Sequence, residues 1–158
     1  MTQRLVAIIR LAGKTGLKKG IKDGFKIIRL YKKNTCVIVP NTDSFMGMLK
    51  NLSSYTTWGE IDEPTLKLLF KSRGKIVGNK PLTDIYTKEK ISSTIEQFAS
   101  DVFNFKKKPT DIPGLKLFFR LKPPQGGFER KGVRQPFSLG GAFGYRKEKI
   151  NDLIKRMI

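Results

Sequence analysis

The sequence predicts an α+β fold in which a small sheet is covered by helices, mainly on one face. Two short apolar runs, at residues 5–11 and 36–39, have the composition of buried strands. In residues 115–122 apolar side chains alternate with mostly cationic ones, which is typical of a half-buried strand. Helical patterns lie between these three segments. The order of elements therefore resembles a split βαβ unit related to the ferredoxin-like fold.

Residues 1–58 are expected to form a β-α-β-α core. The run at 5–11 is apolar on nearly both faces, which predicts a central, well-covered strand. Apolar residues at helical spacing predict a helix that ends near Lys33, just before the second strand. Thr42 or Asp43 can then cap a second helix.

Residues 59–114 are expected to form a helical insertion before the return strand. Asp62 and Pro64 carry the signals of a helix start, and Gly74 is the expected stop. Another helix is predicted around residues 91–102, where apolar side chains again recur at helical spacing.

The last part of the chain is expected to contain the return strand, a basic tract and a final helix. The strand is predicted at residues 115–122 and ends at Pro123, because proline supplies no backbone N–H to a sheet. Residues 123–147, which we call the basic tract, are rich in glycine and proline and hold few residues that could build a core. Helical spacing predicts a C-terminal helix within residues 148–158.

The charge of the chain points to a polyanionic partner. The 158 residues include 32 Lys and Arg but only 13 Asp and Glu, so the net charge is +19. Solubility alone requires much less, and the self-repulsion of a compact cationic domain is relieved by a polyanion. There is no histidine, so the commonest acid–base group and metal ligand is missing. Cys36 is the single cysteine, and no apolar run is long enough to span a bilayer.

The basic tract is expected to remain extended and to lie along structured RNA. It gains little from folding on itself, and its glycines let the backbone approach a partner closely. Aromatic residues are interleaved with cations, and planar rings can stack on unpaired bases. For Phe128 and Tyr145, packing in the core and stacking on RNA both remain open.

The candidate RNA-binding residues are cations on the core and insertion, together with the cations and the Pro-Pro-Gln-Gly-Gly turn of the tract. They are Arg4, Arg10, Lys14, Lys18, Lys19, Lys71, Arg73, Lys75, Lys80, Lys122, Pro123, Pro124, Gln125, Gly126, Gly127, Arg130, Lys131, Arg134 and Arg146.

Two patterns suggest other chemistry. Gly13-Lys14-Thr15 has the context of a phosphate-binding P-loop, but that loop also needs glycine at position 8, where Ile8 stands. We therefore assign its lysine to RNA backbone. Glu60, Asp62 and Glu63 form a tight acidic cluster that could hold Mg²⁺ for nuclease chemistry. The same acids suit a helix start, where they cap free N–H groups, and this second interpretation is favoured.

Six short motifs are distributed over nearly the whole chain. They are Val39–Asp43, Met46–Met48, Tyr55–Gly59, Pro123–Gly127, Gly140–Gly144 and Ile150–Ile154. Together they resemble the large-subunit ribosomal protein L-thirty family in its archaeal form, the counterpart of the eukaryotic L-seven proteins. The resemblance implies an antiparallel three-stranded sheet with helices on one face. It also implies contact with large-subunit rRNA, proximity to 5S rRNA, and neighbouring ribosomal proteins. Archaeal relatives commonly carry Arg where Gln125 stands, which is a departure from the family pattern.

We therefore expect a cytoplasmic structural constituent of the large ribosomal subunit that binds and organises rRNA. No enzymatic activity, cofactor, metal, membrane or small-molecule substrate is expected. Two alternatives stay open. One is a Mg²⁺-dependent RNA-processing nuclease built on the acidic cluster. The other is a non-specific nucleic-acid condensing protein, which would bind duplex DNA and rRNA equally.

Overall fold

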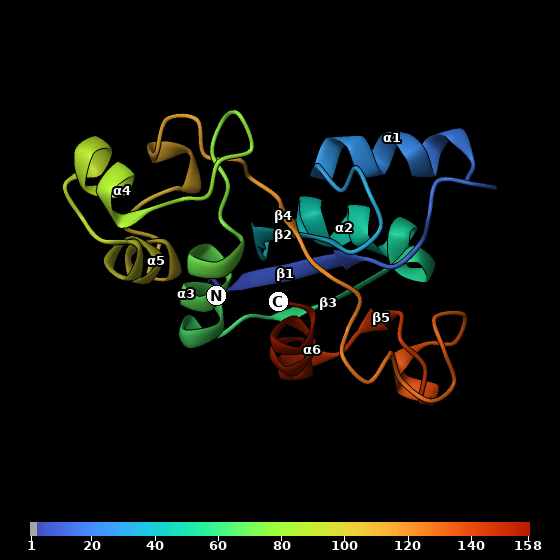
Figure 1. The fold of residues 1–158 in the computed structure, drawn as a ribbon. Coiled ribbons are helices and arrows are strands. Elements are labelled where there is room, and N and C mark those ends of the chain that lie inside the picture. Colours follow the sequence, from blue (N-terminus) through green and yellow to red (C-terminus); the bar gives the residue numbers. More distant parts are fainter. Residues whose placement is uncertain (1–2) are drawn as a thin grey trace.

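A five-stranded sheet organises the structure, a computed structural model that describes residues 3–158 (Figure 1). Strand β1 (Leu5–Arg10) lies at its centre, in the order β4-β2-β1-β3-β5. Antiparallel partners flank it on both sides, β2 (Thr35–Pro40) and β3 (Thr56–Glu60). The edges are two-residue strands. β4 (Phe119–Arg120) is antiparallel to β2, and β5 (Gly144–Tyr145) is parallel to β3.

The two faces of the sheet are covered by different helices. Val6 and Ile8 pack with α1 (Lys19–Ile28) and α2 (Asp43–Leu52). The residues of β1 that alternate with these two face the other side of the sheet. That second face carries α3 (Glu63–Arg73), α5 (Ile95–Phe103) and α6 (Ile150–Met157). Figure 1 shows α1 and α2 on the side of β1 opposite α6. All six residues of β1 are therefore buried.

Most helix boundaries follow the expected capping chemistry. The hydroxyl of Thr42 accepts a hydrogen bond from the Phe45 N–H, which identifies Thr42 as the cap of α2. The Asp62 carboxylate accepts from the Thr65 N–H at 2.8 Å and caps α3, which ends at Gly74 as predicted. The helix predicted around residues 91–102 is in fact preceded by a separate short helix, α4 (Asp84–Ile91).

The α+β class and the initial β-α-β-α order are confirmed, but two details of the sheet differ from expectation. Helices cover both faces, not mainly one, and the sheet has five strands where three were expected. Strand β3 was missed because its sequence, Thr-Thr-Trp-Gly-Glu, lacks an apolar run. The proposed division of the chain at residues 58, 114, 122 and 147 stays a prediction.

The return strand predicted at 115–122 is much shorter than expected. Only Phe119 and Arg120 pair with the sheet, opposite Cys36 and Thr35 of β2. The start of the segment instead contacts the inserted loop, where the Lys116 N–H donates to the Lys75 carbonyl oxygen at 2.9 Å. The alternation therefore predicted the burial of Leu115, Phe119 and Leu121, but not the length of the pairing. Among residues 3–158, no helix is long and apolar enough to cross a bilayer.

Glycine is required at position 59 of β3, because the chain that leads into α6 crosses directly over it. A Cβ atom at this position would overlap the carbonyl oxygen of Lys147 and press on the Cβ of Ile150. Backbone at Lys147 cannot retreat easily, since α6 is anchored in the core on that face.

We predict that Gly59→Ala lowers the free energy of unfolding by about 2 kcal/mol or more, because the added methyl group overpacks the contact with Lys147. Gly47→Ala is the control. Gly47 is an exposed position of α2 with nothing within 4 Å of an added Cβ. That change should stabilise the protein by about 0.5–1 kcal/mol, as Ala for Gly does in a helix. Urea titration measures the free energy of unfolding of both variants. Equal stability would contradict the close crossing of the Lys147 backbone over Gly59.

Candidate nucleic-acid interface

The basic tract is tied to the C-terminal helix and does not extend away from the core. The Lys122 N–H donates to the Met157 carbonyl oxygen at 2.8 Å, and the Gln125 N–H donates to that of Arg156 at 3.0 Å. The Arg156 guanidinium in turn donates a hydrogen bond of 2.8 Å to the carbonyl oxygen of Gly127. Three links therefore hold the start of the tract against α6.

The tract also folds on itself, which corrects the expectation that it would gain little by doing so. Phe128, Val133 and Phe143 pack against the main core cluster, in which Ala142 is fully buried. The Ala142 N–H donates to the carbonyl oxygen of Gly132 at 3.0 Å and closes the loop. These apolar residues are irregularly spaced among glycines, so no periodic pattern reveals them in the sequence.

Arg146 closes this loop from the inside. Its Nη1 donates to Oε1 of Glu129 at 2.5 Å, its Nη2 to the Ala142 carbonyl oxygen, and its Nε to Oγ1 of Thr57. The guanidinium also lies 4.9 Å from the ring centroid of Phe137. Only 2% of the residue is exposed, so Arg146 is unavailable for the RNA contact predicted for it. It is a structural link between the tract and β3.

Arg10 is likewise buried, with 4% exposed. Its Nε, Nη1 and Nη2 donate to the carbonyl oxygens of Ala12, Leu30 and Gly13, and its guanidinium lies 4.0 Å from the ring centroid of Phe25. Desolvation by burial lowers the pKa of this guanidinium. Arg10 therefore braces the loop after β1 and is not a surface contact.

Most of the other candidates are exposed. Arg73 and Lys75 are half-buried, and Pro124 is buried. The exposed candidates are Arg4, Lys14, Lys18, Lys19, Lys71, Lys80, Lys122, Pro123, Gln125, Gly126, Gly127, Arg130, Lys131 and Arg134.

The fold gathers these candidates into separate groups. Arg73 and Lys122 meet at the C-terminal end of α6, because Arg73 donates to the Ile158 carbonyl oxygen while Lys122 bonds to Met157. Lys14 and Lys18 lie on the loop between β1 and α1. Arg4 precedes the opposite end of β1. The cations predicted from the sequence therefore lie at both ends of β1 and at the C-terminal end of α6, and Arg4 lines a hollow together with Phe137 and Ser138 of the tract.

The turn at Gly126 and Gly127 is open to a partner. Both residues have positive φ, 77° and 76°, a conformation that side chains other than glycine rarely adopt. An added Cβ at either position would meet nothing within 4 Å. The backbone of this turn is therefore exposed while its base is fixed to α6 through Gln125.

Tyr145 and Phe128, whose roles the sequence left open, are placed differently. Phe128 is half-buried against the main core. Tyr145 is 45% exposed, lies 6.3 Å from the ring of Trp58 and donates a hydrogen bond from its hydroxyl to Glu60. Burial, and then this bond, raise the pKa of Tyr145 to about 12.

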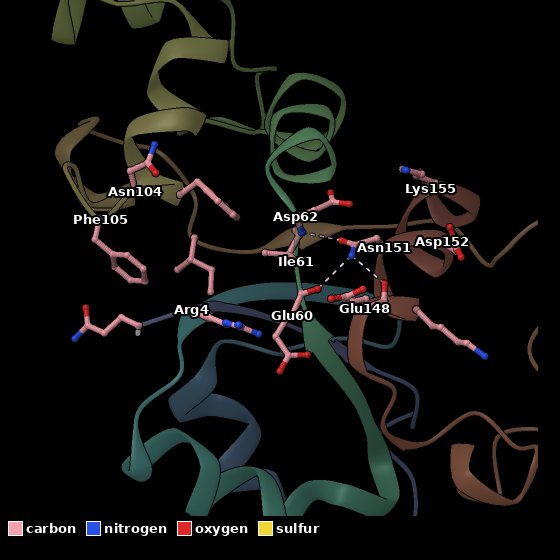
Figure 2. A pocket seen from close by; sticks show the side chains of 14 residues that line it. Arg4, Glu60, Ile61, Asp62, Asn104, Phe105, Glu148, Asn151, Asp152 and Lys155 are labelled. Atoms are coloured by element: carbon pink, nitrogen blue, oxygen red, sulfur yellow. Dashed lines mark hydrogen bonds between the residues drawn. The ribbon is translucent and has the colours of Figure 1, made fainter. Parts of the chain in front are cut away.

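Glu60 and Asp62 of the acidic cluster line a pocket of about 920 Å³, but their carboxylates do not converge, and Glu63 does not line it (Figure 2). Figure 2 shows the carboxylates of Glu60 and Asp62 pointing away from each other, with Asn151 bonded to the backbone between them. Asp62 caps α3, and Glu63 accepts from the Ser100 hydroxyl at 2.6 Å and pairs with Lys67. The Ser100 bond, followed by Lys67, lowers the pKa of Glu63.

These acids are therefore occupied in structural roles. Within the part of the chain that the structure describes, no group of three or more His, Cys, Asp or Glu side chains could hold a metal ion. The arrangement does not support the nuclease alternative.

We predict that Arg146→Met lowers the free energy of unfolding by about 3 kcal/mol or more, because it leaves Glu129 partly buried without its cation. Arg134→Met removes an exposed cation of the same tract and should change stability by less than about 0.5 kcal/mol. Chemical denaturation separates the two outcomes. A small effect of Arg146→Met would show that the buried ion pair does not hold the tract in place.

Comparison of the sequence with known proteins shows the family of the chain. No protein-family model matches the chain. It is, however, 46% identical over 154 residues to a protein of Nanoarchaeum equitans named large ribosomal subunit protein uL30, covering 98% of this chain and 99% of that protein. Proteins of the same name from Methanopyrus kandleri and Methanococcus maripaludis are 42% and 43% identical, over 94% and 96% of this chain and 100% and 98% of their own lengths. Identity of this extent along essentially the whole length shows that the chain belongs to the uL30 family.

Proposed function

We propose that this protein is a structural constituent of the large ribosomal subunit, where it binds and organises large-subunit rRNA in the cytoplasmic ribosome. The family relatives carry the name of a large-subunit protein and match this chain almost end to end. Proximity to 5S rRNA and contact with neighbouring ribosomal proteins are part of the same proposal, on the family resemblance. The role involves binding and positioning, with no catalytic step.

The observation that carries the proposal is a surplus of exposed cations without partner acids. The net charge is +19, and only three ion pairs form among residues 3–158. Among the candidate RNA-binding residues, Arg146 is the one found in these pairs. The remaining charges repel one another, and phosphates of a folded RNA relieve that repulsion.

The mechanism is electrostatic and geometric. Each phosphate that Lys or Arg neutralises releases condensed counterions, which drives binding and makes it sensitive to salt. Phosphate contacts fix position and register, whereas the shape of the folded RNA supplies much of the specificity. Because hydrogen bonds tie the basic tract to α6, Arg130, Lys131 and Arg134 project from a scaffold that the protein's own contacts hold in place.

We predict that replacing Arg130, Lys131 and Arg134 together by Gln weakens binding to deproteinised large-subunit rRNA. The slope of log affinity against log salt should fall by about 2, since each lost phosphate contact removes about 0.7–0.9. Thermal unfolding should be nearly unchanged, because all three side chains are exposed. Filter binding across a salt series measures the slope.

The matched control replaces Lys88, Lys90 and Lys106 by Gln. These exposed lysines lie on or near α4 and α5 and are not candidate contacts. Their replacement removes the same charge as the first triple variant. Equal losses in both triple variants would show that net charge, and not the tract, governs binding. Equal affinity of the natural protein for duplex DNA at the same salt would instead support the condensing alternative and contradict the proposed function.

A further inference from the structure

A small basic hollow lies beside α1, away from the tract. It has a volume of about 350 Å³ and is formed by residues of β1 and the loop after it, one side of α1 and the turn that follows α1. The cations Arg10, Lys14, Lys22 and Lys26 line it, together with the rings of Phe25 and Tyr31. Lys22, Lys26 and Tyr31 were not among the sequence-predicted RNA contacts.

No acidic side chain lines this hollow. Lys22 and Lys26 are one turn apart on α1, so they project from the same side of the helix. In the described chain, residues 3–158, none of the four cations forms an ion pair with a carboxylate. Four like charges around one small cavity repel one another, and an anion placed among them removes that repulsion.

Arg10 supplies a fixed positive charge at the base of the hollow. Each guanidinium nitrogen donates to a backbone carbonyl oxygen, at 2.7 to 3.0 Å, and Cζ lies 4.0 Å from the centroid of the Phe25 ring. These carbonyls satisfy hydrogen bonds but do not neutralise the charge. A buried cation without a carboxylate favours an anion nearby.

Tyr31 supplies an aromatic surface at the rim. It is 44% exposed, and its ring meets Phe118 in a perpendicular contact with centroids 5.5 Å apart. Phe118 is itself half-buried, with Lys116 and Arg120 within about 6 Å of its ring. The contact holds the Tyr31 ring in place while leaving much of it free to stack.

We infer that this hollow binds one unpaired nucleotide of the rRNA, with its base stacked on Tyr31 and its phosphate among Lys14, Lys22 and Lys26. The inference rests on the proposed function and adds a site to it. A lone phosphate would satisfy the cations but leave the aromatic rim unused, whereas paired bases cannot present a face to Tyr31. A hollow of this volume is within the range that accepts small molecules.

Two variants test the two halves of the site against deproteinised large-subunit rRNA. Tyr31→Ala should lower affinity at least about fivefold with the salt slope unchanged, because it removes stacking and no charge. Tyr31→Phe should retain affinity. Lys22→Gln with Lys26→Gln should lower the salt slope by about 1 to 2, because it removes phosphate contacts and no ring.

Matched controls separate these effects from general ones. Phe105→Ala removes an aromatic ring that is 40% exposed, close to the value for Tyr31, from the pocket lined by Glu60 and Asp62, and should leave affinity for rRNA unchanged. Lys88→Gln with Lys90→Gln removes the same charge from α4 and should leave the slope nearly unchanged. Thermal unfolding of each variant shows whether the fold is retained.

Photocrosslinking then identifies the ligand. A benzophenone amino acid in place of Tyr31, followed by mapping of reverse-transcription stops, should mark a single unpaired nucleotide. Marks spread over many positions or over a duplex, or full affinity of Tyr31→Ala, would overturn the inference. If the tract variant still weakens rRNA binding in that case, the proposed function stands and only this site fails. If the natural protein shows no preference for rRNA, the proposed function itself fails.

Discussion

The structure depends on the complete burial of β1. A strand whose six residues are all inaccessible must be covered on both faces, and its alternate side chains therefore require two separate sets of helices. α1 and α2 supply one cover, and α3, α5 and α6 supply the other. Because the apolar faces of these helices pack on the sheet, their cations are directed outward. The need to bury both faces of the sheet thus also produces the charged surface.

Two arginines show how a surplus of cations is divided between folding and binding. Arg10 and Arg146 are buried, each bonded through its guanidinium nitrogens, while the neighbouring Lys14 and the nearby Arg134 are exposed. The planar guanidinium can satisfy several fixed oxygens at once, which a lysine ammonium does less well. Arginine therefore serves inside this fold as a rigid connector between loops. A count of basic residues overstates the surface that is available to RNA.

Local signals in the sequence were sufficient for several of the elements, but not for the strands and contacts that depend on long-range pairing. The strand predicted at residues 5–11 and the start of α3 at Asp62 depend on periodicity and nearby donors, and both are confirmed; for α2 the structure selects Thr42 from the two expected caps, Thr42 and Asp43. Strand β3 depends on pairing with β1 and on Gly59 passing under Lys147, and neither is visible as a pattern. Burial of Arg146 depends on its bonds to Glu129 and Thr57, which are distant in sequence. Arg146 was assigned to RNA binding because it is a cation of the tract, whereas the structure gives it a structural role. The exposure of Arg130, Lys131 and Arg134 agrees with the surface role expected of them, because charged side chains are rarely buried without a partner and the tract packs through Phe128, Val133 and Phe143 instead.

The ordered state of the basic tract changes how its charges can act. A segment that folds only on binding loses part of the gross interaction energy to ordering, so each contact contributes less to affinity. Here the Arg146–Glu129 pair, the Gly132–Ala142 bond and the links to α6 offset part of that cost within the protein. The tract can therefore act as a preformed surface, against which RNA segments adjust. Its glycines at 126 and 127 then form an exposed turn with positive φ and open space around an added Cβ, which suits the close approach of a partner that the sequence predicts for this turn.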